Sequence, residues 1–316
     1  MLSRKTCAAI SLLGIVCWGS MGCGPGGQRA AGGKKTVRIG GSDTMVNLAQ
    51  AWAEAYKKSH PDVSVQVSGG GSGVGIANLI KGTTDIANSS REMKKSEKEA
   101  VSKNAGQEPQ EFEVGKDALA VYVHKDNPLE VISMADLAEI YGEHGKITKW
   151  SQLGVANKLC GSDEITRVSR QNNSGTYQYF REAVLTGQEY KAESVALSGS
   201  KDLVAMISRT PCAIGYSGMG YHTAEVKWLK VAQQQGDSGV EPSVDTVQHK
   251  TYPISRPLFM YTRGEPAGEV KEFLDWVRSE AGQKVVIDLG YVPLHAAATG
   301  EIETVKTSEE PAEEKQ

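Results

Sequence analysis

The sequence has few cysteines, no excess of charge of either sign, and no long hydrophobic run beyond its first residues. Five cysteines occur among 316 residues, without a Cys-x-x-Cys pair or a cluster of cysteine and histidine, so a structural zinc site has no support. The 35 lysines and arginines nearly balance the 38 aspartates and glutamates, for a net charge of −3. This balance argues against a nucleic-acid binder, which needs a basic surface. We expect no metal and no other cofactor.

The longest hydrophobic run covers residues 8–18 and is too short to span a bilayer. It follows two basic residues and ends at small residues before Cys23, which is typical of an export signal. We therefore expect residues 1–22 to be removed as a signal peptide. The segment before Cys23 is similar to a bacterial lipobox, except that Ser20 stands where leucine is usual. We expect Cys23 to carry a lipid, with a plain secreted protein as the alternative.

Export would place the body in the periplasm or on the outer face of the cell membrane, where disulfides persist. Cys160 and Cys212 are the two cysteines of the body, and an even pair in such a compartment favours a disulfide over two free thiols. The glycine-rich residues 23–35 are expected to form a flexible tether to the anchor. The acidic residues 301–316 are expected to be disordered.

Short β-branched runs alternate with helical patterns throughout the body, which indicates an α/β fold. The expected strand and helix pairs are 37–40 with 45–59, 63–68 with 75–81, and 165–169 with 177–185. Two late helices are expected from the apolar spacing between residues 270 and 289. Two further strand-like runs, 117–124 and 255–262, flank the middle of the chain. If both are crossovers, one lobe comprises 36–118 plus 255–300 and the other comprises 119–254.

Three turns combine a preceding strand, glycine with serine or threonine, and a following helix, at residues 41–44, 69–73 and 170–176. The start of a helix offers unpaired N–H groups and a partial positive charge, and hydroxyls add donors, so such turns can bind anions. One serine or threonine alone is more often only a helix cap. Three such turns, one of them with Arg170, favour an anion site. The glycine-rich turn matches neither nucleotide motif, and no nucleophile elbow is present.

Seven segments, in order, resemble the PstS family, the phosphate-binding lipoproteins of high-affinity phosphate ABC importers. They are GSDTM at 41–45, SGGGSGVG at 68–75, TDIANSSR at 84–91, IYGEHGKITKW at 140–150, RQNNSGTY at 170–177, AIGYSGMGY at 213–221 and AGQKVVIDLGYVPL at 281–294. The resemblance implies an α/β type II periplasmic binding protein fold, with two α/β lobes joined by two crossover strands. Such a protein closes over one phosphate and delivers it to the membrane permease of an ABC transporter.

The resemblance also implies which residues contact phosphate, and it implies no catalytic residue. The implied ligands are Thr44, the Met45 amide, Ser72, Ser90, Arg170, Ser174, Gly175 and Thr176. Further candidates beside them are Ser42, Asp43, Gly73 and Arg91.

Two positions depart from the family pattern, namely Ser90 and Asn172. Some members carry an aspartate where Ser90 stands, and its carboxylate accepts the proton that phosphate has and sulfate lacks. A receptor for sulfate, arsenate or molybdate is therefore one alternative. A secreted phosphatase with Ser72 or Thr44 as nucleophile is another, although no histidine lies near these turns in sequence. A phosphate sensor without a permease is a third. We expect a monomer that binds no nucleic acid.

Overall fold

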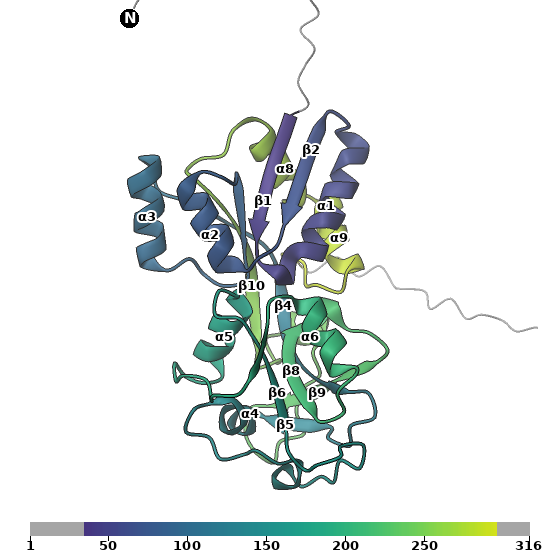
Figure 1. Cartoon of the computed structure of the whole chain (residues 1–316). Coiled ribbons are helices and arrows are strands. Elements are labelled where there is room, and N and C mark those ends of the chain that lie inside the picture. The colour runs from purple at the N-terminus through teal and green to yellow at the C-terminus, as the bar shows by residue number, and fades with distance from the viewer. Residues whose placement is uncertain (1–34, 296–316) are drawn as a thin grey trace, which may run out of the picture. The chain divides into compact units, whose positions relative to one another are not determined.

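Two α/β lobes make up the computed structural model, which describes residues 35–295 (Figure 1). The signal peptide, Cys23, nearly all of the tether and the acidic tail lie outside the described residues. The first lobe is built from β1 (Lys35–Gly41), the 3-10 turn η1 (Asp43–Met45), α1 (Val46–Ser59), β2 (Val63–Ser68), α2 (Ser72–Lys81), β3 (Ile86–Ser89), α3 (Lys95–Ala105), α8 (Gly268–Arg278) and α9 (Glu280–Asp288).

The second lobe is formed by the middle of the chain. It contains β5 (Val131–Ser133), α4 (Met134–Tyr141), η2 (Trp150–Leu153), β6 (Thr166–Arg170), α5 (Gly175–Ala183), β7 (Val195–Leu197), α6 (Ser200–Ile207), β8 (Ala213–Gly218), η3 (Met219–Tyr221), β9 (Val226–Ala232) and α7 (Val244–Gln248). The strands β4 (Gln110–His124) and β10 (Ser255–Thr262) connect the lobes and pair with each other in antiparallel fashion.

The strand order is β2-β1-β3-β10-β4-β8-β6-β7. In the first lobe β1 pairs in parallel with β2 and β3, whereas β10 runs antiparallel to β3. The long β4 changes partner along its length, because residues 110–118 pair with β10 and residues 119–123 pair with β8. One continuous strand thus belongs to both lobes, and it brings their sheets together at a fixed register.

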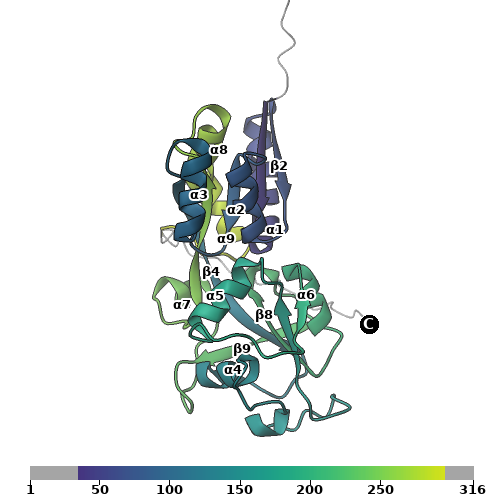
Figure 2. The ribbon, with the colours of Figure 1, turned by 60° about the vertical axis from the view of Figure 1, so that its left-hand side comes forward.

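Alternating side chains of the first lobe pack on opposite faces of its sheet, as the two-residue period of a strand requires. On β10, Leu258 and Met260 face a core with Trp52 of α1 and Phe273 of α8. The next residue of that strand, Phe259, belongs to the other core, beneath α2 and α3. Figure 1 shows α2 and α3 on one side of the strands and α1 on the other, and Figure 2 shows the same lobe turned. The sheet is therefore covered on both faces, as parallel strands require.

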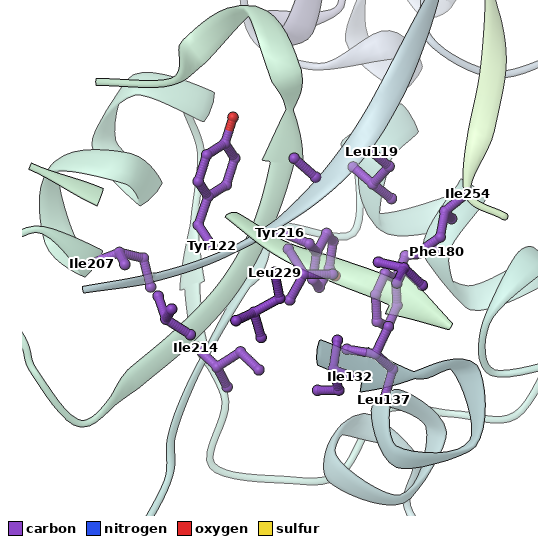
Figure 3. Close-up of a cluster of buried hydrophobic side chains, with 14 of the residues drawn as sticks. Leu119, Tyr122, Ile132, Leu137, Phe180, Ile207, Ile214, Tyr216, Leu229 and Ile254 are labelled. Carbon is purple, nitrogen blue, oxygen red and sulfur yellow. The ribbon is translucent and has the colours of Figure 1, made fainter. Parts of the chain in front are cut away.

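The second lobe has its own core, which contains Tyr216 of β8 and Phe180 of α5 (Figure 3). The rings of Phe180 and Tyr216 lie parallel with their centroids 3.9 Å apart, and Tyr141 meets Tyr216 edge-on at 5.4 Å. The Tyr141 hydroxyl donates to the Ile214 carbonyl at 2.8 Å, so its polar end is satisfied inside the core.

A disulfide joins Cys160 and Cys212, whose Cα atoms are 5.0 Å apart. It ties the loop before β6 to the start of β8, and the Thr166 amide donates to the Cys212 carbonyl at 2.9 Å beside it. The bond therefore lies at the start of β6, at the opposite end of that strand from Arg170.

Candidate anion-binding site

The three hydroxyl-rich turns follow the carboxyl ends of β1, β2 and β6, where the two lobes meet. This is the edge at which open α/β sheets bind ligands. Ser90 follows the end of β3 and joins them there. The backbone also connects the lobes, because the Gly73 amide donates to the Asn173 carbonyl at 3.0 Å and the Asn173 side-chain amide donates to the Gly70 carbonyl at 3.0 Å.

Glycine is required where α2 begins. Gly71 has φ +91°, and a Cβ atom there would lie 2.7 Å from the Asn173 carbonyl oxygen of the other lobe. A side chain would thus clash with the partner lobe in addition to straining the backbone. The unusual run of three glycines at 69–71 lets the start of α2 approach the second lobe.

The first turn of α5 lies against two serines of the first lobe. The Ser174 hydroxyl caps this helix by accepting from the Thr176 amide at 3.1 Å, and the Gly175 amide, as the first of the helix, has no carbonyl partner within it. A Cβ on Gly175 would lie 2.3 Å from Ser72 Oγ and 2.6 Å from Ser90 Oγ. The N-terminus of α5, which is the positive end of the helix dipole, therefore faces these two hydroxyls.

Buried hydroxyls from both lobes form the centre of the candidate site. Ser42 Oγ donates to Ser90 Oγ at 3.0 Å, and Ser72 Oγ lies 3.4 Å from Ser90 Oγ. Between the lobes, Thr44 Oγ1 and Thr176 Oγ1 are 2.9 Å apart. Each of these residues is at most 2% exposed. Hydroxyls can turn to donate to an anion, so the cluster offers donors at little cost in ordering.

Arg170 lies 1% exposed at the end of β6. Its Nη2 donates to Asp43 Oδ2 of the first lobe at 3.0 Å, and its Nη1 donates to Ser200 Oγ at 2.9 Å. Nη2 also donates to the Ser198 carbonyl. Burial lowers the pKa of Arg170, and the charge of Asp43 opposes this shift. The guanidinium is thus held in a fixed orientation by contacts with both lobes.

Arg256, on β10, is a second buried guanidinium that the sequence did not single out. Its Nε and Nη2 donate to Asp117 Oδ2 at 3.3 and 3.0 Å. Nη2 also lies 3.2 Å from Thr44 Oγ1 and 3.0 Å from Thr176 Oγ1. Burial raises the pKa of Asp117, whereas the charge of Arg256 acts to lower it. Arg256 therefore contacts one hydroxyl of each lobe.

Three other candidates from the sequence already have hydrogen-bond partners within the protein. Arg91 pairs with Glu97, because its Nη1 and Nη2 each donate to one carboxylate oxygen at 2.8 Å. The Met45 amide donates to the Ser42 carbonyl at 3.0 Å within η1. Asp43 accepts from the Gly70 amide through Oδ1 at 2.8 Å and from Arg170 through Oδ2. These groups support the turns or neighbouring residues.

The cluster suits an oxyanion and offers no support for a metal ion. It combines hydroxyls, the N-terminus of α5 and two guanidiniums, all of which donate hydrogen bonds to negative oxygen. Among the residues that the structure describes, no group of three or more histidine, cysteine, aspartate or glutamate side chains could hold a metal ion. In residues 35–295 no helix is long and apolar enough to cross a bilayer.

Known proteins are similar to this chain in sequence and in fold. Residues 26–281 match the family described as PBP superfamily domain. A relative named phosphate-binding protein PstS, from Pseudomonas aeruginosa, is 34% identical over 279 residues, which cover 85% of this chain and 86% of the relative. The Bacillus subtilis protein of the same name is 37% identical over 270 residues, covering 85% and 83% of the two chains.

A solved structure from Clostridium perfringens has the same architecture. It is described as a putative phosphate ABC transporter substrate-binding protein with bound phosphate. It superposes with a TM-score of 0.72 at 32% identity and covers 83% of this chain and 100% of the solved one. The chain belongs to the PstS family of phosphate-binding proteins, within the PBP superfamily.

Proposed function

We propose that this protein captures inorganic phosphate between its two lobes and delivers it to the permease of an ABC importer. The observation that carries the proposal is the meeting of buried hydroxyls, the N-terminus of α5 and Arg170 at the lobe junction. The names of the relatives point to the same ligand. The role is binding and not catalysis, since the relatives are named for binding and transport.

The ligands in this proposal come from both lobes. They are the hydroxyls of Ser42, Thr44, Ser72, Ser90 and Thr176, the Gly175 amide and Arg170, with Ser174 as the cap that orients the first turn of α5. An anion that contacts both lobes favours the closed arrangement, because it gains contacts there that one lobe alone cannot give. Met45, Gly73, Asp43 and Arg91 support the turns without contacting the ligand.

Selection of phosphate over sulfate rests on hydroxyl oxygens in this proposal. Both carboxylate oxygens of Asp43 already accept hydrogen bonds, from Gly70 and Arg170. Ser90, by contrast, lies between Ser42 and Ser72 and can accept a proton from a ligand while donating elsewhere. A neutral hydroxyl can donate a hydrogen bond to sulfate, whereas an ionised carboxylate repels it. We therefore expect weaker discrimination than in members with aspartate at this position.

The remaining parts of the chain fit an exported receptor. We propose that residues 1–22 are a signal peptide and that the protein works outside the cytoplasm, anchored by a lipid on Cys23. The lobes comprise residues 36–118 plus 255–300 and residues 119–254. Because one chain supplies ligands from both lobes, the site is complete in a monomer.

Isothermal titration of the purified, phosphate-stripped protein tests the proposal. Phosphate should bind with one site per chain and a Kd of micromolar or less. Sulfate, arsenate and molybdate, added as competitors, distinguish a phosphate receptor from a general oxyanion receptor. Absence of heat with every one of these anions would show that the three turns serve only as helix caps.

A further inference from the structure

Arg256 occupies the connection between the lobes and not either lobe alone. It stands opposite Asp117 in the antiparallel register of β10 and β4, and both residues are at most 2% exposed. Asp117 also accepts from the Met219 amide at 3.2 Å. The pair is therefore fixed to the two crossover strands by backbone pairing, directly beside the hydroxyl cluster.

The guanidinium has donors beyond those that Asp117 uses. Its Nη2 reaches Thr44 of the first lobe and Thr176 of the second, and its Nη1 is buried without a hydrogen-bond partner in the described part of the chain. An unsatisfied buried donor on a cation is costly. A structural neutraliser of Asp117 would need neither the contacts with both threonines nor a free donor.

These contacts also determine where the threonine hydroxyl protons point. Arginine only donates, and each hydroxyl has one proton and two acceptor positions. Nη2 has two N–H groups for three acceptors, Asp117 and the two threonine oxygens, so at least one N–H is shared. Because N–H groups of Nη2 face both threonine oxygens, the threonine protons must point away from the guanidinium. One proton can serve the 2.9 Å bond between Thr44 and Thr176, and the other is left for a ligand.

We propose that Arg256 is a fourth component of the phosphate site, beside the serine and threonine hydroxyls, the N-terminus of α5 and Arg170. Held on the crossover strands, it supplies positive charge and leaves one hydroxyl of the Thr44–Thr176 pair turned toward the anion. This inference rests on the proposed function. In addition to Arg170, the site then has a second cation, which contacts a threonine of each lobe. Asp117 is then a positioning residue that holds the guanidinium in place and partly offsets its charge.

Phosphate titration of matched variants tests this role. Arg256→Gln with Asp117→Asn removes both charges together and leaves no unpaired buried ion. We expect this double variant to bind phosphate at least tenfold more weakly than the wild type. The control is Arg38→Gln with Asp85→Asn, because Arg38 also donates to an aspartate through Nε and Nη2, in a partly exposed pair that starts from β1. The control should stay within threefold of the wild type.

Single variants separate a role in binding from a role in folding. Asp117→Asn leaves the cation in place and removes an opposing charge, so phosphate should bind as tightly as in the wild type or more tightly. A purely structural ion pair would instead make this variant and Arg256→Gln weaken binding alike. Arg256→Lys keeps a charge beside Asp117 but loses the planar fork, and we expect at least fivefold weaker binding. It replaces the double variant if that variant does not fold.

Phosphate binding by the wild type tests the proposed function separately from the role of Arg256. If the wild type does not bind phosphate, the proposed function is wrong. If the wild type binds phosphate and neither the double variant nor Arg256→Lys weakens binding more than threefold, the inference about Arg256 is wrong and the function stands.

Discussion

Buried charge at the lobe junction is compensated residue by residue. Arg170 pairs with Asp43 at 3.0 Å and Arg256 pairs with Asp117 at 3.0 Å. Each ion costs several kcal/mol to bury unless its partner and hydrogen bonds compensate for lost water. The pairs leave the site near neutral before the anion arrives. Ligand charge must then be met by hydroxyls, amides and the spare donors of the guanidiniums.

Removal of the Arg170 guanidinium should therefore damage both the site and its lobe contact. We expect Arg170→Met to weaken phosphate binding by about 2 kcal/mol or more, or roughly 30-fold in Kd, since it leaves Asp43 without its cation. Titration calorimetry measures the change. Arg167→Met is the matched control, because Arg167 is also buried on β6 but donates to the Ala192 carbonyl. Equal losses in both variants would mean that Arg170 acts only through folding.

The Arg91 pair should act on stability and on its pH dependence. Burial acts to raise the pKa of Glu97, but hydrogen bonds from Arg91 and the Lys94 amide outweigh it and hold this pKa below its ordinary value. A lowered pKa in the folded state gives stability that is present above about pH 4.3, the unfolded value, and is lost as pH falls through the folded pKa.

We expect Glu97→Gln to lower the free energy of unfolding by about 1–3 kcal/mol at pH 7, with the difference from wild type shrinking below about pH 4. Urea unfolding at several pH values measures it. Glu99→Gln on the same helix is the control, since Glu99 is exposed and lies 4.0 Å from Lys95. A difference that stays constant between pH 7 and pH 3 would contradict the assignment.

Residue identities at the site were accessible from the sequence to different degrees. The hydroxyl turns are local patterns and could be located from the sequence, whereas the resemblance to the PstS family implied the individual contacts Ser72, Ser174 and Thr176. Arg256 could not, because its contact with Asp117 spans 139 positions and depends on the register of β4 and β10. Arg91 was a further candidate for contact with the ligand, but its guanidinium pairs with Glu97 in the first turn of α3.

At the scale of elements, helix starts position the donors. The strand at Ser255–Thr262 has the bounds expected from its sequence. By contrast, α2 begins at Ser72 and not at residue 75, and α5 begins at Gly175 and not at residue 177. Apolar spacing detects only the buried face of a helix. The polar first turns, which make the site, lie outside that signal.

Close approach of the lobes at the start of α2 can be tested with one glycine. Gly71→Ala should weaken phosphate binding tenfold or more, because its Cβ would meet the Asn173 carbonyl at 2.7 Å. Gly106→Ala is the control: this residue has φ +73°, and a Cβ there meets nothing within 4 Å. Gly106→Ala should lose about 1–2 kcal/mol of stability through left-handed backbone strain. Gly71→Ala should lose at least as much, because its strain is accompanied by the clash, and only Gly71→Ala should lose affinity. Equal affinities would show that the lobes do not meet there.

At the scale of the whole molecule, two lobes, each with its own hydrophobic packing, are joined by two crossover strands. The sequence predicted this division because 117–124 and 255–262 are strand-like runs on either side of the middle segment. It did not reveal that β4 extends back to Gln110, so that its residues 110–118 pair with β10 along the whole length of β10. That pairing joins residues far apart in the sequence. The local spacing of hydrophobic residues, on which the prediction rests, carries no information about such contacts.

The disulfide should affect stability without affecting binding. Cys160 and Cys212 are 52 residues apart, and closing a loop of that size stabilises the folded state by up to about 4 kcal/mol in the chain-entropy model. Cys160→Ser with Cys212→Ser should therefore lower the melting temperature measured by calorimetry. Phosphate affinity should be unchanged, because Arg170 lies at the other end of β6. A large loss of affinity would show that the two ends of the lobe are coupled.

A crystal structure of the phosphate complex tests the central claim most directly. The expected result is one phosphate buried between the lobes, with oxygens about 2.6–3.2 Å from donors of both. Those donors should include Ser72 or Ser90 from the first lobe and the Gly175 amide or Thr176 from the second. Phosphate contacting a single lobe, or lying away from the hydroxyl cluster, would contradict the claim.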